Sequence, residues 1–394
     1  MLQQTWEQRK LGEIYKRVNE RNDGTLGRDK WISVAKMYFQ DPEKVQSNNL
    51  DTRTYVMKKG DIAFEGHPNN EFKFGRFVLN DIGTGIISEL FPIYRPIVKY
   101  DLEFWKYAIQ LERIMAPIFS KSITSSGNSS NKLDQNHFLN QMISIPTIDE
   151  QKKIGLILKT ITNLITLHQR KLEHLKLKKK SLLQKLFPRE GELYPELRFP
   201  GFTDPWEQRR LGEISTYLQN NTLSRDELNY KVPNIQNIHY GDILIKFDEV
   251  VDGSSTDIPF INKFLDLSKY NKSLLRDGDV VLADTAEDGT VGKAIELQNV
   301  KPSHILAGLH TIPCRPLIAF GKGYLGNFFN SESYRLQLRP LIQGIKVSSI
   351  SKNLLKNTIV KYPQDLLEQK QIGNVFYKIT MLITLHQEES FLHK

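Results

Sequence analysis

Cysteine and long apolar runs are scarce in this sequence of 394 residues. Cys314 is the only cysteine, which excludes an internal disulfide and a cysteine-rich metal site. A reducing, cytoplasmic location is the default expectation for such a chain. No run reaches the roughly 18 apolar residues that a membrane-spanning helix needs, and the first residues hold no apolar stretch typical of a signal peptide. We therefore expect a cytoplasmic protein that does not enter a membrane.

Signatures of catalysis are equally scarce. No Pro-Pro pair occurs, so the Asn/Asp-Pro-Pro-aromatic motif of adenine methyltransferases is missing. The stretch Asn80–Gly85 is similar to the glycine-rich turn that holds S-adenosylmethionine, but no acidic residue ends an obvious following strand, and we favour a structural turn. The stretch Gly289–Ala294 is not a phosphate-binding loop, because Glu287 replaces the first glycine and no Ser or Thr follows Lys293. Histidines and carboxylates show no metal-ligand spacing, so we expect no catalytic residue and no metal site.

Positive charge exceeds negative charge. The sequence has 54 Lys and Arg against 45 Asp and Glu, a formal net charge of +9. An excess of this size favours a polyanionic partner such as nucleic acid, and an ordinary basic protein is the alternative. Hydrophobic residues make up 39% and aromatic residues 10%, enough to build folded cores, and the length suits two or three domains.

Two segments of the sequence occur twice. Trp6–Ile14 returns as Trp206–Ile214, with eight of nine positions identical. Residues 150–170 return as residues 368–388, with 13 of 21 positions identical. The first pair is offset by 200 residues and the second by 218. The chain therefore consists of two tandem halves whose ends agree and whose middles differ.

The two middles, about residues 15–148 and 215–365, differ in detail but share a pattern. Each contains a turn followed by an apolar strand, at Lys59–Phe64 and at Asp277–Leu282. Glycines and β-branched residues punctuate short alternating runs, which is typical of mixed, β-rich domains. We therefore predict the α+β class, with two β-rich mixed domains in a pseudo-two-fold arrangement.

Residues 150–187 are predicted to form one long helix, because they contain no proline and a single glycine, and Pro188 follows them. Their apolar residues recur at alternating steps of four and three, which is the coiled-coil period, and His168 and Lys179 fill two of its positions. A helix of this length spans roughly 57 Å. A second helix repeats the pattern and stops with the chain at Lys394, so we expect two antiparallel coiled-coil helices of unequal length.

These segments divide the chain into four parts. We predict a first domain at 1–148, a spacer helix at 149–188, a linker with a second domain at 189–366, and a truncated second spacer helix at 367–394. His168 and His386 occupy matching positions of the two helices. We favour partly buried histidines within the helix pair over a metal site or a pH switch.

The order of these motifs resembles that of the specificity subunits of Type I restriction–modification systems. Each half opens with Trp-Glu-x-x-x-Leu-Gly-Glu-Ile, and the segment Leu197–Trp206 leads into the second half. The run Pro146–Gly155 is similar to the family pattern Pro-x-x-x-Glu-Gln-Lys-x-Ile-Gly, and Pro363–Gly373 carries one extra residue. The resemblance covers essentially the whole chain, because both the order and the duplication match.

The resemblance implies a non-catalytic subunit of a complex that is both a Type I site-specific deoxyribonuclease and an adenine-N6 DNA methyltransferase. Such a subunit recognises an asymmetric, bipartite DNA target, with one half-site for each target-recognition domain and a fixed gap set by the helices. Its implied partners are double-stranded DNA, two methyltransferase subunits and two restriction–translocase subunits, with no membrane partner. S-adenosylmethionine, ATP and Mg²⁺ are then expected on the partner subunits, and no cofactor on this chain.

Other functions remain open from the sequence. A stand-alone methyltransferase-like enzyme would use the turn Asp81–Gly85, whereas a coiled-coil scaffold would not bind DNA at all. A stand-alone DNA-binding protein without enzyme partners is a closer variant of the favoured function.

Candidate DNA-contacting residues come from polar and aromatic loops at equivalent places in the two middles. Direct readout needs side chains that reach base edges, whereas phosphate contacts position the protein. In the first middle the candidates are Lys36, Tyr38, Arg76, Asn128 and Ser129. In the second middle they are Gln236, Asn237, His239, Tyr240, Lys346, Ser348 and Ser349. An ordinary surface role is the alternative for each of them.

The helices offer two further candidate surfaces. An apolar face is the candidate dock for the methyltransferase subunits, and it consists of Ile157, Leu164 and Leu167 with the counterparts Val375, Leu382 and Leu385. A face that packs against the chain's own domains is the alternative. Basic residues between Arg170 and Lys185 face either DNA phosphates or solvent.

Overall fold

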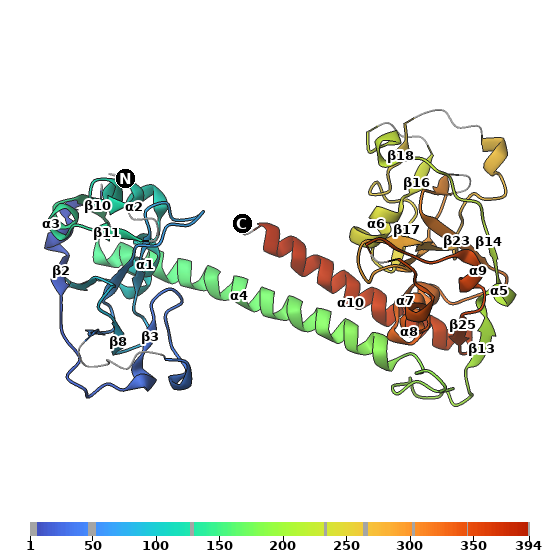
Figure 1. The fold of residues 1–394 in the computed structure, drawn as a ribbon, viewed down its shortest axis with the longest axis horizontal. Coiled ribbons are helices and arrows are strands. Elements are labelled where there is room, and N and C mark those ends of the chain that lie inside the picture. The colour runs from blue at the N-terminus through green and yellow to red at the C-terminus, as the bar shows by residue number, and fades with distance from the viewer. Residues whose placement is uncertain are drawn as a thin grey trace. The chain divides into compact units, whose positions relative to one another are not determined.

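The computed structural model describes residues 6–45, 53–126, 130–231, 235–262, 267–301, 304–344 and 346–392 (Figure 1). The chain divides into two compact units, Met1–Thr166 and Leu167–Lys394, and the boundary falls inside the long helix α4 (Ile148–Lys185). Each unit combines short strands with short helices, and α10 (Leu366–Leu392) is a second long helix. The predicted α+β class with two β-rich units and two long helices is confirmed, and the pseudo-two-fold relation of the units stays a prediction.

The first unit is built around a four-stranded antiparallel sheet in the order β2-β9-β6-β7. Its strands are β2 (Tyr15–Val18), β9 (Ile93–Pro96), β6 (Ile62–Glu65) and β7 (Arg76–Leu79). Shorter ladders flank it: β3 (Ile32–Ser33) with β4 (Tyr38–Phe39), β5 (Thr54–Met57) with β8 (Gly85–Ser88), and β10 (Ile123–Ser126) with β11 (Asn131–Leu133).

Three short helices complete the first unit. They are α1 (Leu102–Ala108), α2 (Glu112–Ser120) and α3 (Gln135–Leu139). Asp101 caps α1 and Asp134 caps α3, and in each case the carboxylate accepts a hydrogen bond from a backbone N–H of the first turn. The rings of Phe77, Phe119 and Phe138 pack together between these helices and the sheet, which gives the unit its own buried core.

The second unit contains a five-stranded sheet in the order β14-β23-β19-β21-β17 and a four-stranded sheet in the order β15-β18-β16-β22. The strands of the larger sheet are β14 (Ser215–Tyr217), β23 (Thr311–Pro316), β19 (Val280–Ala283), β21 (Ala294–Gln298) and β17 (Val250–Asp252). Those of the smaller sheet are β15 (Leu228–Asn229), β18 (Phe260–Ile261), β16 (Gln236–Ile238) and β22 (Ile305–Ala307).

Short elements surround the two sheets of the second unit. The helices are α5 (Leu211–Ile214), α6 (Tyr240–Ile245), α7 (Tyr324–Asn330), α8 (Glu332–Leu338) and α9 (Lys352–Leu355). A further ladder joins β20 (Thr285–Ala286) to β24 (Ser348–Ser349). The predicted turns at Lys59–Phe64 and Asp277–Leu282 both lead into buried strands, β6 and β19.

The repeated segments form the same framework in each unit. In the first unit β1 (Glu7–Lys10) pairs antiparallel with β12 (Met142–Ile145), and in the second β13 (Glu207–Arg210) pairs antiparallel with β25 (Ile359–Tyr362). The register is equivalent, because Glu7 faces Ile145 and Glu207 faces Tyr362. The sequence repeat therefore corresponds to a structural repeat.

Each long helix has a glycine at the point where it contacts its own unit most closely. A Cβ atom at Gly155 would lie 2.7 Å from the backbone nitrogen of Phe104, and one at Gly373 would lie 2.1 Å from the carbonyl oxygen of Lys322. Both distances are shorter than a van der Waals contact, so only glycine lets each helix approach its own unit this closely.

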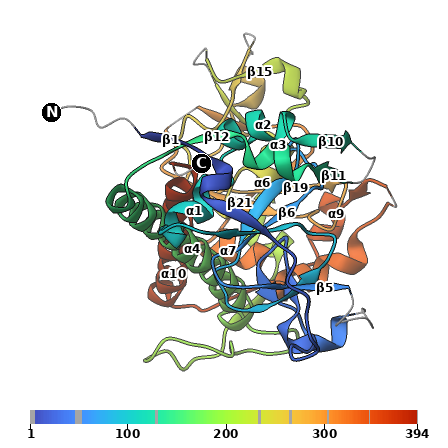
Figure 2. The ribbon, with the colours of Figure 1, turned by 90° about the vertical axis from the view of Figure 1, so that its left-hand side faces the viewer.

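Within the second unit, α10 packs on the last part of α4. The rings of Phe187 and Phe376 lie 6.0 Å apart, and those of His168 and His386 lie 5.3 Å apart. Higher residue numbers of α4 thus meet lower numbers of α10, so the predicted antiparallel packing is confirmed there. Figures 1 and 2 both show the two segments side by side. His386 is buried and His168 half-buried, as predicted for histidines within the helix pair.

Candidate nucleic-acid interface and helix surfaces

Three candidates of the first unit lie together beside the hairpin of β3 and β4. Lys36 is exposed in its turn and Tyr38 is exposed on β4. Arg76, the first residue of β7, donates from Nη2 to the carbonyl oxygen of Ala35 (2.6 Å) and from Nε to Oε2 of Glu65 (2.9 Å). The guanidinium is therefore fixed against the hairpin, while Lys36 and Tyr38 are open to solvent. We call these three residues the first-unit surface. Asn128 and Ser129 lie outside the described residues.

Two candidates of the second unit lie inside it. The amide nitrogen of Gln236 donates to the carbonyl oxygen of Ser255 (2.8 Å), and Oδ1 of Asn237 accepts from Nδ2 of Asn221 (2.6 Å). Both side chains are buried on β16, between β18 and β22. Because both side chains are buried and face the interior of the unit, we leave Gln236 and Asn237 out of the proposed interface.

His239 and Tyr240 stand at the start of α6. Nδ1 of His239 accepts a hydrogen bond from the backbone nitrogen of Gly241 (3.2 Å) and so caps the helix. Burial lowers the pKa of His239 below its ordinary value, because the charged form loses hydration. The ring of Tyr240 lies 4.6 Å from that of His239 and is half-buried. His239 therefore has a structural role that supports Tyr240.

His310 is a neighbour of these candidates that sequence reasoning missed. Its exposed ring lies 5.3 Å from the ring of Tyr240, and Nδ1 lies 3.3 Å from Oδ1 of Asp284. Thr285 of β20, which follows Asp284 in the sequence, pairs with Ser349 of β24. His310 thus links Tyr240 to the strand that carries Ser348 and Ser349. His310 has a φ of 55° in the turn before β23, and no local sequence pattern indicates that conformation.

The loop that carries Lys346 is closed by its own backbone. The amide of Gln343 donates to the carbonyl oxygen of Ser349 (3.0 Å), and the reverse bond measures 2.7 Å. Gly344 has a φ of 110°, and a Cβ atom there would lie 2.0 Å from the carbonyl oxygen of Val347, so the turn requires glycine. Lys346 is exposed at its end. We call the following residues the second-unit surface: Tyr240, His310, Lys346, Ser348 and Ser349.

The predicted helix face is largely exposed. Five of its six members, all except Val375, have between 42% and 60% of their surface open to solvent: Ile157, Leu164, Leu167, Leu382 and Leu385. Val375 is half-buried and packs against the core of the second unit. An exposed leucine is common, but a row of them along one helix is typical of an interaction surface.

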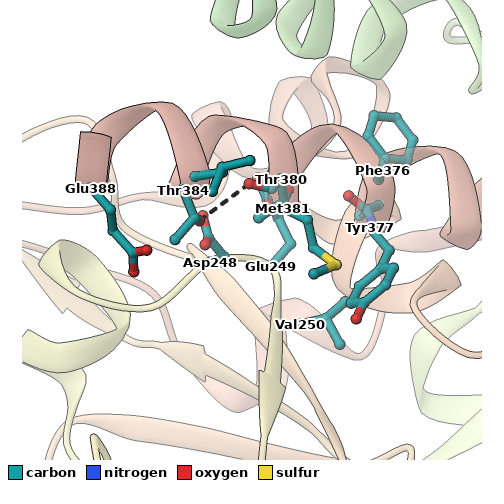
Figure 3. A pocket seen from close by; sticks show the side chains of 11 residues that line it. Asp248, Glu249, Val250, Phe376, Tyr377, Thr380, Met381, Thr384 and Glu388 are labelled. Atoms are coloured by element: carbon teal, nitrogen blue, oxygen red, sulfur yellow. Dashed lines mark hydrogen bonds between the residues drawn. The ribbon is translucent and has the colours of Figure 1, made fainter. Parts of the chain in front are cut away.

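A cavity of about 370 Å³ adjoins this face of α10 (Figure 3). Tyr377, Met381 and Leu385 line it from the helix, and Asp248 and Glu249 line it from the loop before β17. The dashed line in Figure 3 marks the hydrogen bond from the hydroxyl of Thr384 to the carbonyl oxygen of Thr380 (3.2 Å). The cavity thus has an apolar wall on the helix and an acidic wall on the loop.

Two residues of the basic run on α4 have acidic partners. Nζ of Lys179 lies 2.6 Å from Oε2 of Glu249, and its side chain is only 12% exposed. Nζ of Lys185 lies 2.8 Å from Oε1 of Glu196. Lys179 therefore fixes α4 to the second unit and is directed away from solvent.

The turn similar to an S-adenosylmethionine site is held by its own side chains. Nδ2 of the buried Asn80 donates to the carbonyl oxygens of Met57 (3.1 Å) and Gly83 (2.7 Å), and Oδ2 of Asp81 lies 2.5 Å from Nζ of Lys106. These bonds agree with the structural turn that the sequence favours. Among the described residues, no group of three or more His, Cys, Asp or Glu is arranged to hold a metal. No described helix has the length and apolar character to cross a membrane.

Comparisons with known proteins agree with the motifs. No family model matches the chain. The specificity subunit of the Type I restriction enzyme MjaVIII from Methanocaldococcus jannaschii is 27% identical over 280 residues, which are 69% of this chain and 62% of that protein. The chain therefore aligns with less than two thirds of the length of this curated relative.

Solved structures are similar over the whole chain. One chain, from a study of complex assembly and conformational transition of the type I R-M system, has a TM-score of 0.52 and 16% identity, and covers 100% of this chain and 95% of that one. The HsdS subunit from Thermoanaerobacter tengcongensis has a TM-score of 0.48 and 17% identity, and covers 99% and 92%. The first of these supports the fold. The curated match shows that this chain is similar in sequence to one specificity subunit of a Type I restriction enzyme.

Proposed function

We propose that this chain is the DNA-recognition subunit of a Type I restriction–modification complex and that it performs no catalysis itself. The duplicated framework carries the proposal. Equivalent strand pairs, β1 with β12 and β13 with β25, support two units whose remaining parts are unlike. A repeated framework with divergent inserts suits a protein that reads two different short sequences, because each insert can change its contacts while its support is kept.

The first-unit surface and the second-unit surface are the proposed contacts with DNA. Lys36 and Lys346 are exposed and suited to phosphates, whereas Tyr38, Tyr240 and His310 offer rings and polar atoms to base edges or sugars. The two surfaces are built from different residues, so the proposed target is asymmetric, with one half-site for each unit and a gap between them set by the helices. The net charge of +9 favours binding to this polyanion.

The helices are the proposed platform for enzyme partners. Two methyltransferase subunits bind exposed apolar side chains of the long helices, such as Leu164 on α4 and Leu382 on α10, and two restriction–translocase subunits join the complex. S-adenosylmethionine, ATP and Mg²⁺ are bound by those partner subunits and not by this chain. The turn at Asn80 supports this assignment, because the side-chain amide of Asn80 is already hydrogen-bonded to carbonyl oxygens of Met57 and Gly83. The proposed location is the cytoplasm, where the DNA lies.

The test is to map methylated adenines in DNA from cells that contain this chain and its methyltransferase. We expect one motif of two unlike half-sites with a constant gap, which disappears when the gene for this chain is removed. Methylation that is unchanged without this chain would overturn the proposal. Purified chain with its methyltransferase should also protect one footprint over that motif, and protection without sequence preference would count against recognition.

A further inference from the structure

An open apolar groove lies in the first unit. It has a volume of about 460 Å³, and its walls come from β12, α1, α2 and the first turns of α4. Trp6, Phe104, Ile143, Ile154 and Leu158 are among the residues that line it. Trp6 is 42% exposed at its edge, which is unusual for the largest apolar side chain.

The second unit contains the same groove, but it is filled. By the offsets of the repeat, Trp206 corresponds to Trp6, Ile372 to Ile154, and Phe376 to Leu158. All three are buried, and Trp206 is only 2% exposed. The side chains that cover them are Leu186 and Phe187, which follow the end of α4.

Phe187 is the central side chain of this filling. Its ring stacks on that of Phe376 at 6.0 Å and meets the edges of Trp206 at 6.3 Å and Tyr324 at 5.8 Å. Leu182 and Leu183 of the last helical turn pack against the same cluster. A helix end with adjacent leucine and phenylalanine is therefore what closes this groove in the second unit.

An ion pair continues the same contact. Eleven residues after Phe187, Arg198 donates from Nε and Nη2 to the two carboxylate oxygens of Glu368 at 2.8 and 2.9 Å. Glu368 is 1% exposed. Its counterpart in the first unit is Glu150, which is half-buried and accepts hydrogen bonds from the backbone nitrogen and hydroxyl of Thr147, both at 3.0 Å. The first unit thus presents both the groove and the carboxylate, beside each other.

We propose that the groove of the first unit is the docking site for a polypeptide segment of a partner chain with the chemistry of residues 182–198. The segment is a helix end with adjacent leucine and phenylalanine, followed after about ten residues by an arginine. The aromatic ring enters the groove beneath Trp6 and stacks over Leu158. The arginine binds the carboxylate of Glu150. This inference rests on the internal duplication and not on DNA recognition.

A second copy of this chain is not the occupant that the structure favours. Its own Leu186 and Phe187 are buried, at 3% and 1% exposed, and its own Arg198 is bound to Glu368. Supplying them to a neighbour would empty the filled groove of the second unit. A partner that carries the same short pattern has no such cost.

The test uses the full chain and a synthetic peptide of residues 180–203 as the probe. Binding should move the tryptophan emission to shorter wavelength, because Trp6 passes from a wet to a dry environment. The shift should be saturable and should be lost in Trp6→Phe. A peptide with Phe187→Ala should bind at least about tenfold more weakly, since it loses the largest buried apolar group. The Arg198→Ala substitution in the peptide should weaken its binding to the parent chain. The same substitution should make no difference to binding by the Glu150→Gln chain, which lacks the carboxylate.

Two variants of α4 separate the groove from other surfaces. Leu158→Glu places a charge inside the groove and should abolish peptide binding, whereas Leu156→Glu, on a side chain that is 65% exposed outside the groove, should leave it unchanged. Circular dichroism checks that both variants are folded. Equal binding of the parent and Phe187→Ala peptides, or binding that survives Leu158→Glu in the folded chain, would overturn the proposal. Self-association of the chain that the peptide does not reverse would point to a second copy instead and would also contradict it.

Discussion

The ring of Phe187 stacks on the ring of Phe376, with 6.0 Å between the centroids and 10° between the planes. Phe187 follows the end of α4, and Phe376 lies on α10. Their contact joins the two long helices inside one apolar cluster of the second unit, together with Trp206 and Tyr324. The unit therefore depends on a residue that lies before the repeated Trp-Glu motif of its own half.

Phe187→Ala should destabilise the second unit by about 3–5 kcal/mol, because it removes a fully buried aromatic ring from a packed cluster. The change is measured by urea unfolding, followed by the emission of tryptophan, since Trp206 is in contact with Phe187. Leu177→Ala, on an exposed side chain of α4, is the control and should change the free energy of unfolding by less than about 0.5 kcal/mol. Equal effects of the two substitutions would show that the cluster is not a source of stability.

The repeated ends of the two halves were the most predictable part of the fold. Identical residues at Trp6–Ile14 and Trp206–Ile214 form strands with equivalent partners, and the coiled-coil period correctly predicted the long helices. Local pattern was sufficient there, because a helix of many turns and a strand pair leave a strong periodic signal. The different cover of the two grooves was not predictable, since it depends on contacts between Phe187 and residues that are distant in sequence.

The candidate surfaces were predictable only in part. Lys346 was expected in a polar glycine loop and is exposed there. Asn237 looked equally suited to a surface, but its side chain is buried with Asn221 as partner, and nothing local to either residue indicates this pair. His310 was missed because its approach to Tyr240 is created by a turn with positive φ, which histidine adopts without a sequence signature.

His239 should make the second unit less stable in mild acid. Burial lowers the pKa of its ring in the folded chain, whereas the unfolded chain keeps the ordinary value of 6.5. The unfolded state therefore binds more protons below that value, and stability falls as the pH drops through 6.5 towards the folded pKa. His239→Asn keeps an oxygen that can cap the amide of Gly241 and carries no titrating group.

The measurement compares the free energy of unfolding of the parent chain and His239→Asn between about pH 5 and 7.5, a range around the ordinary histidine pKa. We expect the difference between them to shrink or reverse as the pH falls, because only the parent chain loses stability through this group. The carboxylate of Asp242 opposes the effect, whereas Arg225 and His310 add to it. Parallel curves for the two chains would remove His239 as a source of the pH dependence.

Lys346 should contribute to DNA binding without contributing to sequence preference. If its ammonium group contacts a phosphate, Lys346→Ala weakens binding to all sequences and reduces the slope of log affinity against log salt by about one. Both quantities come from fluorescence anisotropy titrations of the chain with its methyltransferase at several salt concentrations. Lys272→Ala, on another exposed lysine of the second unit, is the matched control and should change neither. Loss of discrimination at one base pair with an unchanged salt slope would assign Lys346 to base readout instead.

The exposed leucines of α10 should decide whether the methyltransferase binds. Leu382 and Leu385 are 42% and 49% exposed, so a charged residue is tolerated there in the isolated chain, but it cannot be buried against an apolar partner without losing its hydration. Leu382→Glu and Leu385→Glu should each abolish copurification of the methyltransferase while the circular dichroism spectrum and unfolding midpoint of the chain stay the same. Ile245→Glu, on α6 and 90% exposed, should leave copurification intact, because it adds the same charge away from the helix face. Complexes that survive both substitutions on α10 would place the methyltransferase on another surface of the chain.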